Sequence, residues 1–161
     1  MSILKLNNKL LKLNGKFEVL TISAPPIPDE VWIGAYLWKT KNVSDVIVVS
    51  NPDPNLTTSR VYGDNEANRS LYGGLYTAEM IPSILALYPG WGIATTLAFE
   101  DMITTLGGSS VTGGYIKEDG TTYWNSPNTN ADNTAGWYGR GGGYYLSPMY
   151  DYYDLKNYGY W

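Results

Sequence analysis

Apolar and polar positions alternate over residues 1–22, with two short polar breaks. The stretch Lys5-Leu-Asn-Asn-Lys-Leu10 is echoed by Lys12-Leu-Asn-Gly-Lys-Phe17. Asn-Asn and Asn-Gly pairs are typical of two-residue hairpin turns. The pattern therefore predicts a small meander with strands over residues 3–6, 9–13 and 16–22.

A sheet of this size cannot bury much apolar surface alone. We expect residues 1–22 to form an anchoring arm that oligomerises or docks on a larger partner. The alternative is that the arm packs on the domain that follows it. The apolar residues available for attachment are Leu4, Leu6, Leu10, Leu13 and Phe17.

A proline-rich stretch, Ser23-Ala-Pro-Pro-Ile-Pro28, follows the arm. Because proline favours extended chain, we expect a linker over residues 23–30 and one folded domain over residues 31–161. The chain has 161 residues, of which 43% are apolar, and this is enough for one domain with a core of its own.

Strand and helix signals follow one another in the first part of the domain. Two runs rich in strand-forming residues, Val31–Trp38 and Val46–Ser50, predict strands. The spacing of apolar residues predicts a helix over Tyr76–Leu87, despite Pro82, and a second helix over Thr96–Leu106.

The second predicted helix has the clearest boundaries. Thr95 is a suitable N-cap and Gly107-Gly108 a suitable stop. After Gly113, Gly, Asn, Ser and Thr dominate, which predicts long loops interleaved with short strands. The predicted buried face of the helix consists of Phe99, Met102, Ile103 and Leu106.

Two residue types are absent, and their absence excludes whole classes of chemistry. Without Cys and His, the chain cannot form disulfides, His- or Cys-ligated zinc sites, or Ser-His-Asp and Cys-His catalytic groups. The net charge is −4, and the arm, residues 1–22, carries +3, which leaves −7 for the remainder. An acidic body disfavours nucleic acid as the partner, and the four lysines of the arm fit solvated strand positions.

A long uncharged window lies between Glu79 and Glu100. Pro82, Pro89 and Gly90 interrupt it, so the window predicts a buried helix followed by a turn instead of a membrane span. Lys and Asn also break the first apolar run too early for a secretion signal. We expect a protein made in the cytoplasm with no membrane insertion.

Five amide or carboxylate side chains fall within one nine-residue loop. Calcium prefers several charged oxygen ligands, and only one of the five is a carboxylate, whereas Asn side chains commonly cap their own backbone. We favour structural turns, with calcium as the alternative, and expect neither a metal nor a cofactor. The five residues are Asn125, Asn128, Asn130, Asp132 and Asn133.

Two adjacent carboxylate pairs, Glu100-Asp101 and Glu118-Asp119, raise the question of a glycosidase. Such an enzyme needs two carboxyl groups across a cleft at ~5–10 Å, whereas helix neighbours point apart and Glu118-Asp119-Gly120 predicts a turn. Gly139-Arg-Gly-Gly-Gly143 lacks the strand and helix that flank a phosphate loop. We expect no catalytic residues, and no enzyme.

Ten aromatic side chains fall between Trp137 and Trp161, which is more than a core can use. Tyr among Gly, Asn, Asp and Ser is typical of recognition surfaces. Aromatic rings stack on sugar rings while Asp and Asn bind hydroxyls, so glycan is the favoured ligand class. Core packing is the alternative, and we expect it for Trp124, Trp137 and Trp161. The candidate ligand-binding residues are Tyr144, Tyr145, Tyr150, Asp151, Tyr152, Tyr153, Asp154, Asn157 and Tyr158.

Four stretches of the domain carry a family pattern. They are Val31-Trp-Ile with Tyr36-Leu37; Tyr62-Gly-Asp-Asn-Glu-Ala-Asn68 with Tyr72-Gly-Gly-Leu-Tyr-Thr77; Pro89-Gly-Trp91 with Leu106-Gly-Gly108; and Thr121-Thr-Tyr-Trp-Asn-Ser-Pro-Asn-Thr-Asn-Ala-Asp-Asn133 with Gly136-Trp137. Together they resemble the Fibrobacter succinogenes major paralogous domain family over residues 31–161, and the last stretch is the most specific.

The resemblance implies an α+β fold of the C-type-lectin-like kind, with two helices and a long irregular loop region that carries the ligand face. The chain departs from the family pattern at Ile93-Ala-Thr-Thr-Leu-Ala-Phe99, where the family's Pro, Glu and Trp are absent. Family members also continue to a final strand beyond the position of Trp161. We expect that strand to be missing here or supplied by another chain.

The family occurs in Bacteroidota and in their phages, and the arm resembles those that begin small phage structural proteins. The resemblance implies a virion protein, either a head fibre, a decoration or a tail fibre. It would be attached to other virion proteins through its arm, homotrimeric, and adhesive to host surface glycan or protein. The alternatives are a purely structural decoration or plug that packs on neighbouring subunits, and a bacterial cell-surface adhesin.

Overall fold

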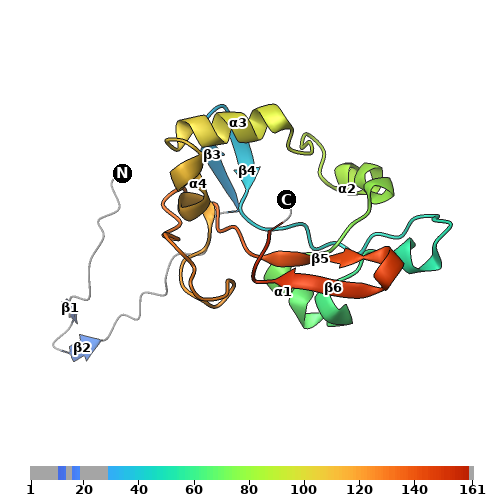
Figure 1. The fold of residues 1–161 in the computed structure, drawn as a ribbon. Coiled ribbons are helices and arrows are strands. Elements are labelled where there is room, and N and C mark those ends of the chain that lie inside the picture. The colour runs from blue at the N-terminus through green and yellow to red at the C-terminus, as the bar shows by residue number, and fades with distance from the viewer. Residues whose placement is uncertain (1–10, 14–15, 19–28, 160–161) are drawn as a thin grey trace.

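A computed structural model describes residues 11–13, 16–18 and 29–159. Within these ranges, four α-helices combine with two-stranded antiparallel sheets and short 3₁₀ turns, as expected for the predicted α+β class (Figure 1). The strands are β1 (Leu11–Leu13), β2 (Lys16–Glu18), β3 (Glu30–Ile33), β4 (Tyr36–Lys39), β5 (Gly142–Leu146) and β6 (Asp151–Leu155). The α-helices are α1 (Ala67–Tyr72), α2 (Ile81–Leu87), α3 (Thr96–Thr105) and α4 (Ser109–Ile116). The 3₁₀ turns are η1 (Pro54–Leu56), η2 (Tyr62–Asp64), η3 (Ala78–Met80) and η4 (Ser147–Met149).

The arm is described at β1 and β2, which pair as an antiparallel hairpin. Leu13 lies opposite Lys16, so two positions separate the strands, as a two-residue turn requires. This confirms pairing between the second and third predicted strands, which contain Leu13 and Phe17. The parts of the prediction that lie outside the described residues are the strand over 3–6, the turn at 14–15, the linker up to residue 28, and Leu4, Leu6 and Leu10.

The run predicted as one strand over residues 31–38 folds as a hairpin instead, with β3 and β4 antiparallel. The chain reverses at Gly34, whose φ is +61°. Ala35 donates its backbone N–H to the carboxylate of Asp101 on α3 at 2.8 Å, and this contact holds the turn against the helix. The freedom of glycine therefore outweighs the strand preference of its neighbours.

The strand predicted over Val46–Ser50 is not formed; among the described residues this segment makes one isolated bridge, between Val48 and Thr58. The Ser59 side chain accepts a hydrogen bond that a backbone carbonyl would accept in a regular β-ladder. Ser59 accepts the N–H of Ile47 with its Oγ at 2.9 Å and donates its own N–H to the Ile47 carbonyl at 2.7 Å. These two hydrogen bonds hold the segment around Ile47 in place, but residues 46–50 do not form a regular β-strand.

The first predicted helix is present and begins later than predicted. Residues 78–80 form the turn η3, and α2 then starts at Ile81. Pro82 lies in the first turn of α2, where the N–H that proline lacks would have no partner. The helix therefore tolerates this proline.

The second predicted helix, α3, is confirmed with its boundaries. The Oγ1 of Thr95 accepts the N–H of Ala98 at 3.2 Å, as an N-cap does. Gly107 and Gly108 follow with φ of +95° and +105°, which ends the helix. Met102 is 1% exposed and lies on the predicted buried face.

Two further helices, α1 and α4, were not predicted. The sequence of α4 is SSVTGGYI, and its two glycines weaken a helix. Contacts with distant residues hold it instead: Gly114 lies so close to Asn130 that an added Cβ would be 2.2 Å from its carbonyl oxygen. The helix α1 has six residues and ends before Gly73, whose φ is +87°.

Trp38 lies at the centre of the larger of two apolar clusters, which joins β3 and β4 to α3 and α4. Its ring centroid is 5.2 Å from that of Phe99 and 5.6 Å from that of Trp137. The indole N–H of Trp137 donates to the carbonyl of Lys39 at 2.8 Å. The second cluster holds α2 and consists of Ile47, Met80 and Ile84.

The predicted core tryptophans are buried where the structure describes them. Trp124 and Trp137 are 7% and 5% exposed, which confirms their assignment to the core. The indole N–H of Trp124 donates to the carbonyl of Gly139 at 2.9 Å. Trp161 lies outside the described residues.

The uncharged window between Glu79 and Glu100 contains α2 and a turn in which Trp91 donates its N–H to the carbonyl of Tyr88 at 3.0 Å. This is the predicted helix followed by a turn. No helix in the described part of the chain is long and apolar enough to cross a membrane.

We expect Gly34→Ala to destabilise the domain more than Gly63→Ala. The two glycines have φ of +61° and +64°, and a residue with a Cβ in this region costs roughly 1–2 kcal/mol. Nothing lies within 4 Å of an added Cβ at Gly63, whereas at Gly34 the Cβ would be 1.9 Å from the Asp101 carboxylate. Urea unfolding should show a further loss of about 1–3 kcal/mol for Gly34→Ala. Equal losses would contradict the packing of this turn on α3.

Candidate functional site

The aromatic tail folds into the antiparallel pair β5 and β6, which we call the tyrosine hairpin (Figure 1, orange to red). Tyr144 pairs with Tyr153, and Tyr145 pairs with Tyr152. Because side chains alternate between the two faces of a strand, Tyr145 and Tyr152 share one face and Tyr144 and Tyr153 share the other. We call these the inner face and the outer face.

The inner face packs against the segment that precedes α1. The ring centroids of Tyr145 and Tyr152 are 5.0 Å apart, and that of Tyr62 is 5.4 Å from Tyr152. The guanidinium of Arg60 lies 4.4 Å from the centroid of the Tyr145 ring, and a cation over an aromatic face is stabilising. These contacts anchor the hairpin to the body of the domain.

A hydrogen-bond network strengthens this anchor. The Tyr152 hydroxyl donates to the Asp64 carboxylate and accepts from Nη1 of Arg60 at 3.1 Å. The same Nη1 donates to Asp64 at 2.9 Å. Partial burial, followed by the hydrogen bond donated to Asp64, raises the pKa of Tyr152 above its ordinary value. The hydroxyl therefore keeps its proton and remains a donor at neutral pH.

The outer face carries a stacked pair of rings. The centroids of Tyr144 and Tyr153 are 5.5 Å apart and their planes differ by 24°. Both residues are half-buried. The Tyr153 hydroxyl contacts the Sδ of Met149 at 3.4 Å, so this aromatic surface continues toward the tip of the hairpin.

The tip consists of the turn η4 and Tyr150. Tyr150 has a left-handed φ of +51° and is 62% exposed, and Met149 is 66% exposed. A left-handed tyrosine is uncommon and strained. The Oγ of Ser147 donates to the Asp53 carboxylate at 2.7 Å. The tip is therefore tied to η1 while its largest side chains face solvent.

The remaining candidate residues lie along β6 and after it. Asp151 is exposed and accepts the next backbone N–H at 2.8 Å. Asp154 has a φ of +60°, and its carbonyl accepts the N–H groups of Asn157 and Tyr158 at 2.9 and 3.1 Å. Asn157 and Tyr158 are exposed and lie at the open end of the hairpin. Of these four candidates, Asp151 lies beside the tip of the hairpin, and Asp154, Asn157 and Tyr158 lie toward its open end.

The Asn-rich loop is held by its own side chains, in the way that the turn interpretation predicts. The Nδ2 of Asn128 donates to the carbonyls of Glu118 and Gly120 at 2.9 and 2.8 Å. Asp132 and Asn133 each accept a backbone N–H farther along the loop, at 2.9 and 2.8 Å. Over the described ranges, no group of three or more acidic side chains could hold a metal ion.

One member of each acidic pair makes a structural contact with a residue distant in sequence. Asp101 accepts the N–H of Ala35 at 2.8 Å, and Glu118 accepts from Nε of Arg140 at 2.5 Å. The glycines around Arg140 allow close backbone contacts. A Cβ on Gly143 would be 2.4 Å from the carbonyl oxygen of Tyr153.

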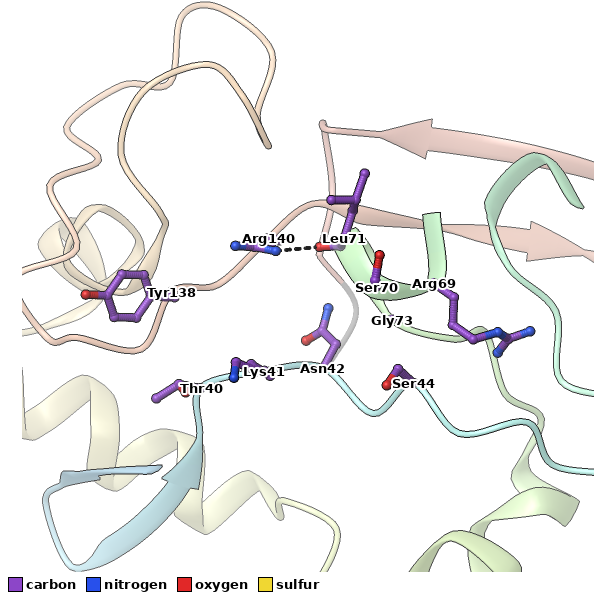
Figure 2. A pocket seen from close by; sticks show the side chains of 10 residues that line it. All are labelled: Thr40, Lys41, Asn42, Ser44, Arg69, Ser70, Leu71, Gly73, Tyr138 and Arg140. Atoms are coloured by element: carbon purple, nitrogen blue, oxygen red, sulfur yellow. Dashed lines mark hydrogen bonds between the residues drawn. The ribbon is translucent and has the colours of Figure 1, made fainter. Parts of the chain in front are cut away.

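Two hollows adjoin the tyrosine hairpin. The smaller, of about 120 Å³, lies at its open end, where residues 40–44, residues 69–73 and the segment with Tyr138 and Arg140 meet (Figure 2). The larger, of about 250 Å³, lies beside the Arg60 network. Its lining residues are Pro54, Asn55, Thr57, Thr58, Ser59, Arg60, Val61, Asp64 and Glu66.

A second aromatic surface, which the sequence analysis missed, lies on the hairpin of β3 and β4. Trp32 is 69% exposed, more than Tyr150. Lys39 pairs with Glu30 at 2.7 Å and stands 4.3 Å from the ring centroid of Trp91. The strand alternation that buries Ile33 would have predicted an exposed Trp32.

No family model, curated protein or solved structure matches this chain. The resemblance to the Fibrobacter succinogenes major paralogous domain family therefore stays a prediction. The residues and their geometry support the function inferred below.

We expect Tyr152→Phe to destabilise the domain by about 1–2 kcal/mol, because Arg60 and Asp64 each lose a hydrogen bond to the Tyr152 hydroxyl. The matched control, Tyr153→Phe, removes a hydroxyl that contacts Met149 and should cost less than ~0.5 kcal/mol. Thermal unfolding would measure both. Equal losses would contradict the anchoring role of the inner face.

We also expect the tip to respond to acid. The Ser147 hydroxyl, followed by the N–H groups of Asn55, lowers the pKa of Asp53 below its ordinary value of 3.8. A lowered pKa stabilises the fold above the ordinary value, and this stabilisation is lost as the pH falls through the folded-state pKa. Ser147→Ala should therefore be more destabilising near neutral pH than at about pH 2, and should raise the pKa of Asp53 in an NMR titration. An unchanged pKa would contradict the tether.

Proposed function

We propose that this protein is a recognition module and not an enzyme. It is a phage virion structural protein that attaches through its N-terminal arm and adheres to host surface glycan or protein. A C-type-lectin-like domain presents the tyrosine hairpin as its ligand face. The observation that carries the proposal is the division of the hairpin: Tyr145 and Tyr152 are anchored by Arg60, while Met149 and Tyr150 are exposed at the tip.

A rigid display of this kind favours binding. Ser147 holds the tip on Asp53, and Arg60 holds the inner face, so little conformational entropy remains to be lost when a ligand binds. Tyrosine offers a broad flat contact together with a hydroxyl, and tyrosine is frequent among the residues that dominate binding energy. Backbone strain of the kind seen at Tyr150 also clusters at functional sites.

Glycan is the favoured ligand class. Aromatic rings stack on the apolar faces of sugars, and carboxylate and amide groups bind sugar hydroxyls. Tyr150 stands next to the exposed Asp151 at the tip, and Tyr158 stands next to the exposed Asn157 at the open end. Each end of the hairpin therefore pairs a ring with a polar group.

The lectin-like fold, the location on a virion and a homotrimer rest on the sequence resemblance. Two structural features are consistent with an irregular loop region on a domain that carries an attachment arm. The segment between α4 and β5 is long and irregular, and side chains such as Asn128 and Asn133 hold it in place. The hairpin of β1 and β2 is too small to be stable without a larger partner, as an attachment arm would be.

The second candidate function is a purely structural decoration, in which the tyrosine hairpin packs on neighbouring virion subunits. The apolar character of the tip favours it, because Met149 and Leu146 are 66% and 36% exposed beside Tyr150, and exposed apolar patches often mark protein contacts. In that case Tyr150 would be buried in the assembled particle. A bacterial cell-surface adhesin is a further alternative that would use the same surface.

We expect Tyr150→Ala and Met149→Ala each to weaken adherence to host cells, or to a glycan found on an array, by about ten-fold. Both side chains are exposed, so the variants should stay folded. Trp32→Ala is the matched control, because it removes an equally exposed aromatic side chain on another hairpin and should leave binding unchanged.

Equal losses for Trp32→Ala and Tyr150→Ala would contradict the assignment of binding to the tyrosine hairpin. Binding to no glycan and to no host cell would leave the structural function. Chemical modification of Tyr150 in purified particles separates the two candidates directly: protection by other virion chains supports decoration, and ready modification supports adhesion.

A further inference from the structure

The smaller hollow, at the open end of the tyrosine hairpin, has a lining suited to an anion. Lys41 and Arg140 border it, together with polar side chains from Thr40, Asn42, Ser44 and Ser70. None of its described lining residues is acidic, although the chain beyond the arm carries a net charge of −7. At about 120 Å³, the space can hold several water molecules, and therefore a carboxylate with part of a sugar ring.

Arg140 is held in place by three neighbours. Its Nε donates to Glu118 at 2.5 Å, its guanidinium lies 3.7 Å from the ring centroid of Tyr123, and its Nη1 donates to the carbonyl of Leu71 at 2.9 Å. Leu71 lines the hollow, whereas Glu118 and Tyr123 do not, so Nη1 of Arg140 reaches the wall of the hollow at Leu71 (Figure 2). These bonds use two of the five N–H donors of the guanidinium, and the other Nη donors of a fixed guanidinium are preorganised to bind a carboxylate.

Lys41 adds a second cation that is free to move. Its ammonium pairs with Asp29 at 2.7 Å, and the two side chains are 65% and 73% exposed, so the pair is weak and easily exchanged. Arg69 also lines the hollow. Its Nε donates to Glu66 at 2.7 Å and its Nη2 to the carbonyl of Ser59 at 3.4 Å, whereas its buried Nη1 has no hydrogen-bond partner among the described residues.

We propose that this hollow binds the carboxylate of an acidic sugar of the uronic acid type. The carboxylate accepts from the Nη edge of Arg140 and attracts Lys41, while hydroxyls of the sugar meet Asn42, Ser44 and Ser70. A neutral sugar lacks the charge-assisted hydrogen bonds that the guanidinium edge offers. This inference rests on the proposed glycan-binding function and specifies acidic glycans as the ligand class.

Glucuronate and glucose test the inference, because they differ in the carboxylate that replaces a hydroxymethyl group. Calorimetric titration of the full chain should show glucuronate binding at least about ten-fold tighter than glucose. Arg140→Lys keeps the charge but loses the fork of donors, and should weaken glucuronate binding about ten-fold. Lys41→Gln should weaken it roughly two- to five-fold. Lys156→Gln, a charge-matched change outside the lining, should have no effect.

Thermal unfolding of each variant would show whether it folds, and the exposed Lys41 keeps the test valid even where Arg140→Lys does not fold. Equal binding of glucuronate and glucose, no binding of glucuronate, or full binding by folded Arg140→Lys would overturn the inference. If tip variants abolish host adherence while glucuronate does not bind, the recognition function stands and the assignment of this hollow fails. If glucuronate binds but the chain adheres to no glycan or cell, the hollow is supported and the adhesion function fails.

Discussion

The display of the aromatic surface depends on Arg60. Its guanidinium donates to the carbonyl of Asn55 at 3.0 Å, to Asp64 at 2.9 Å and to the Tyr152 hydroxyl at 3.1 Å, and it covers the ring of Tyr145 at 4.4 Å. A flat cation with five N–H donors can make these contacts at once, which no other side chain can do. The hairpin therefore has one face fixed to the body, and the exposed side chains of its tip, Met149 and Tyr150, are presented to the surroundings.

A second arginine anchors the open end of the hairpin, which lies opposite the tip. Arg140, two residues before β5, joins Glu118, Tyr123 and the last turn of α1. Together with the tether between Ser147 and Asp53, these contacts immobilise the hairpin at its tip, its inner face and its open end. Rigid support of this kind is what a recognition surface needs.

Local signals predicted those parts of the fold in which neighbouring residues agree. The helix α3 was predicted with both ends, because its cap, its apolar spacing and its terminal glycines all indicate the same boundaries. Prediction failed where one residue or a distant contact overrides the local preference. Gly34 turns a run of strand formers into a hairpin, and α4 exists despite two glycines because Gly114 packs against Asn130. The strand expected over residues 46–50 gives way to the bond between Ile47 and the Ser59 side chain.

By itself, the sequence determined which chemistries are absent, because a chain without Cys and His has no thiol or imidazole. It also favoured a recognition surface over core packing for the aromatic tail, and structural turns over a calcium site for the Asn-rich loop. It did not determine which tyrosines anchor the hairpin to the body of the domain. Strand alternation separates Tyr145 and Tyr152 from Tyr144 and Tyr153, but both pairs are alike in sequence. Only the tertiary structure decided between them, because the group that covers the inner face, Arg60, lies 92 residues away from Tyr152.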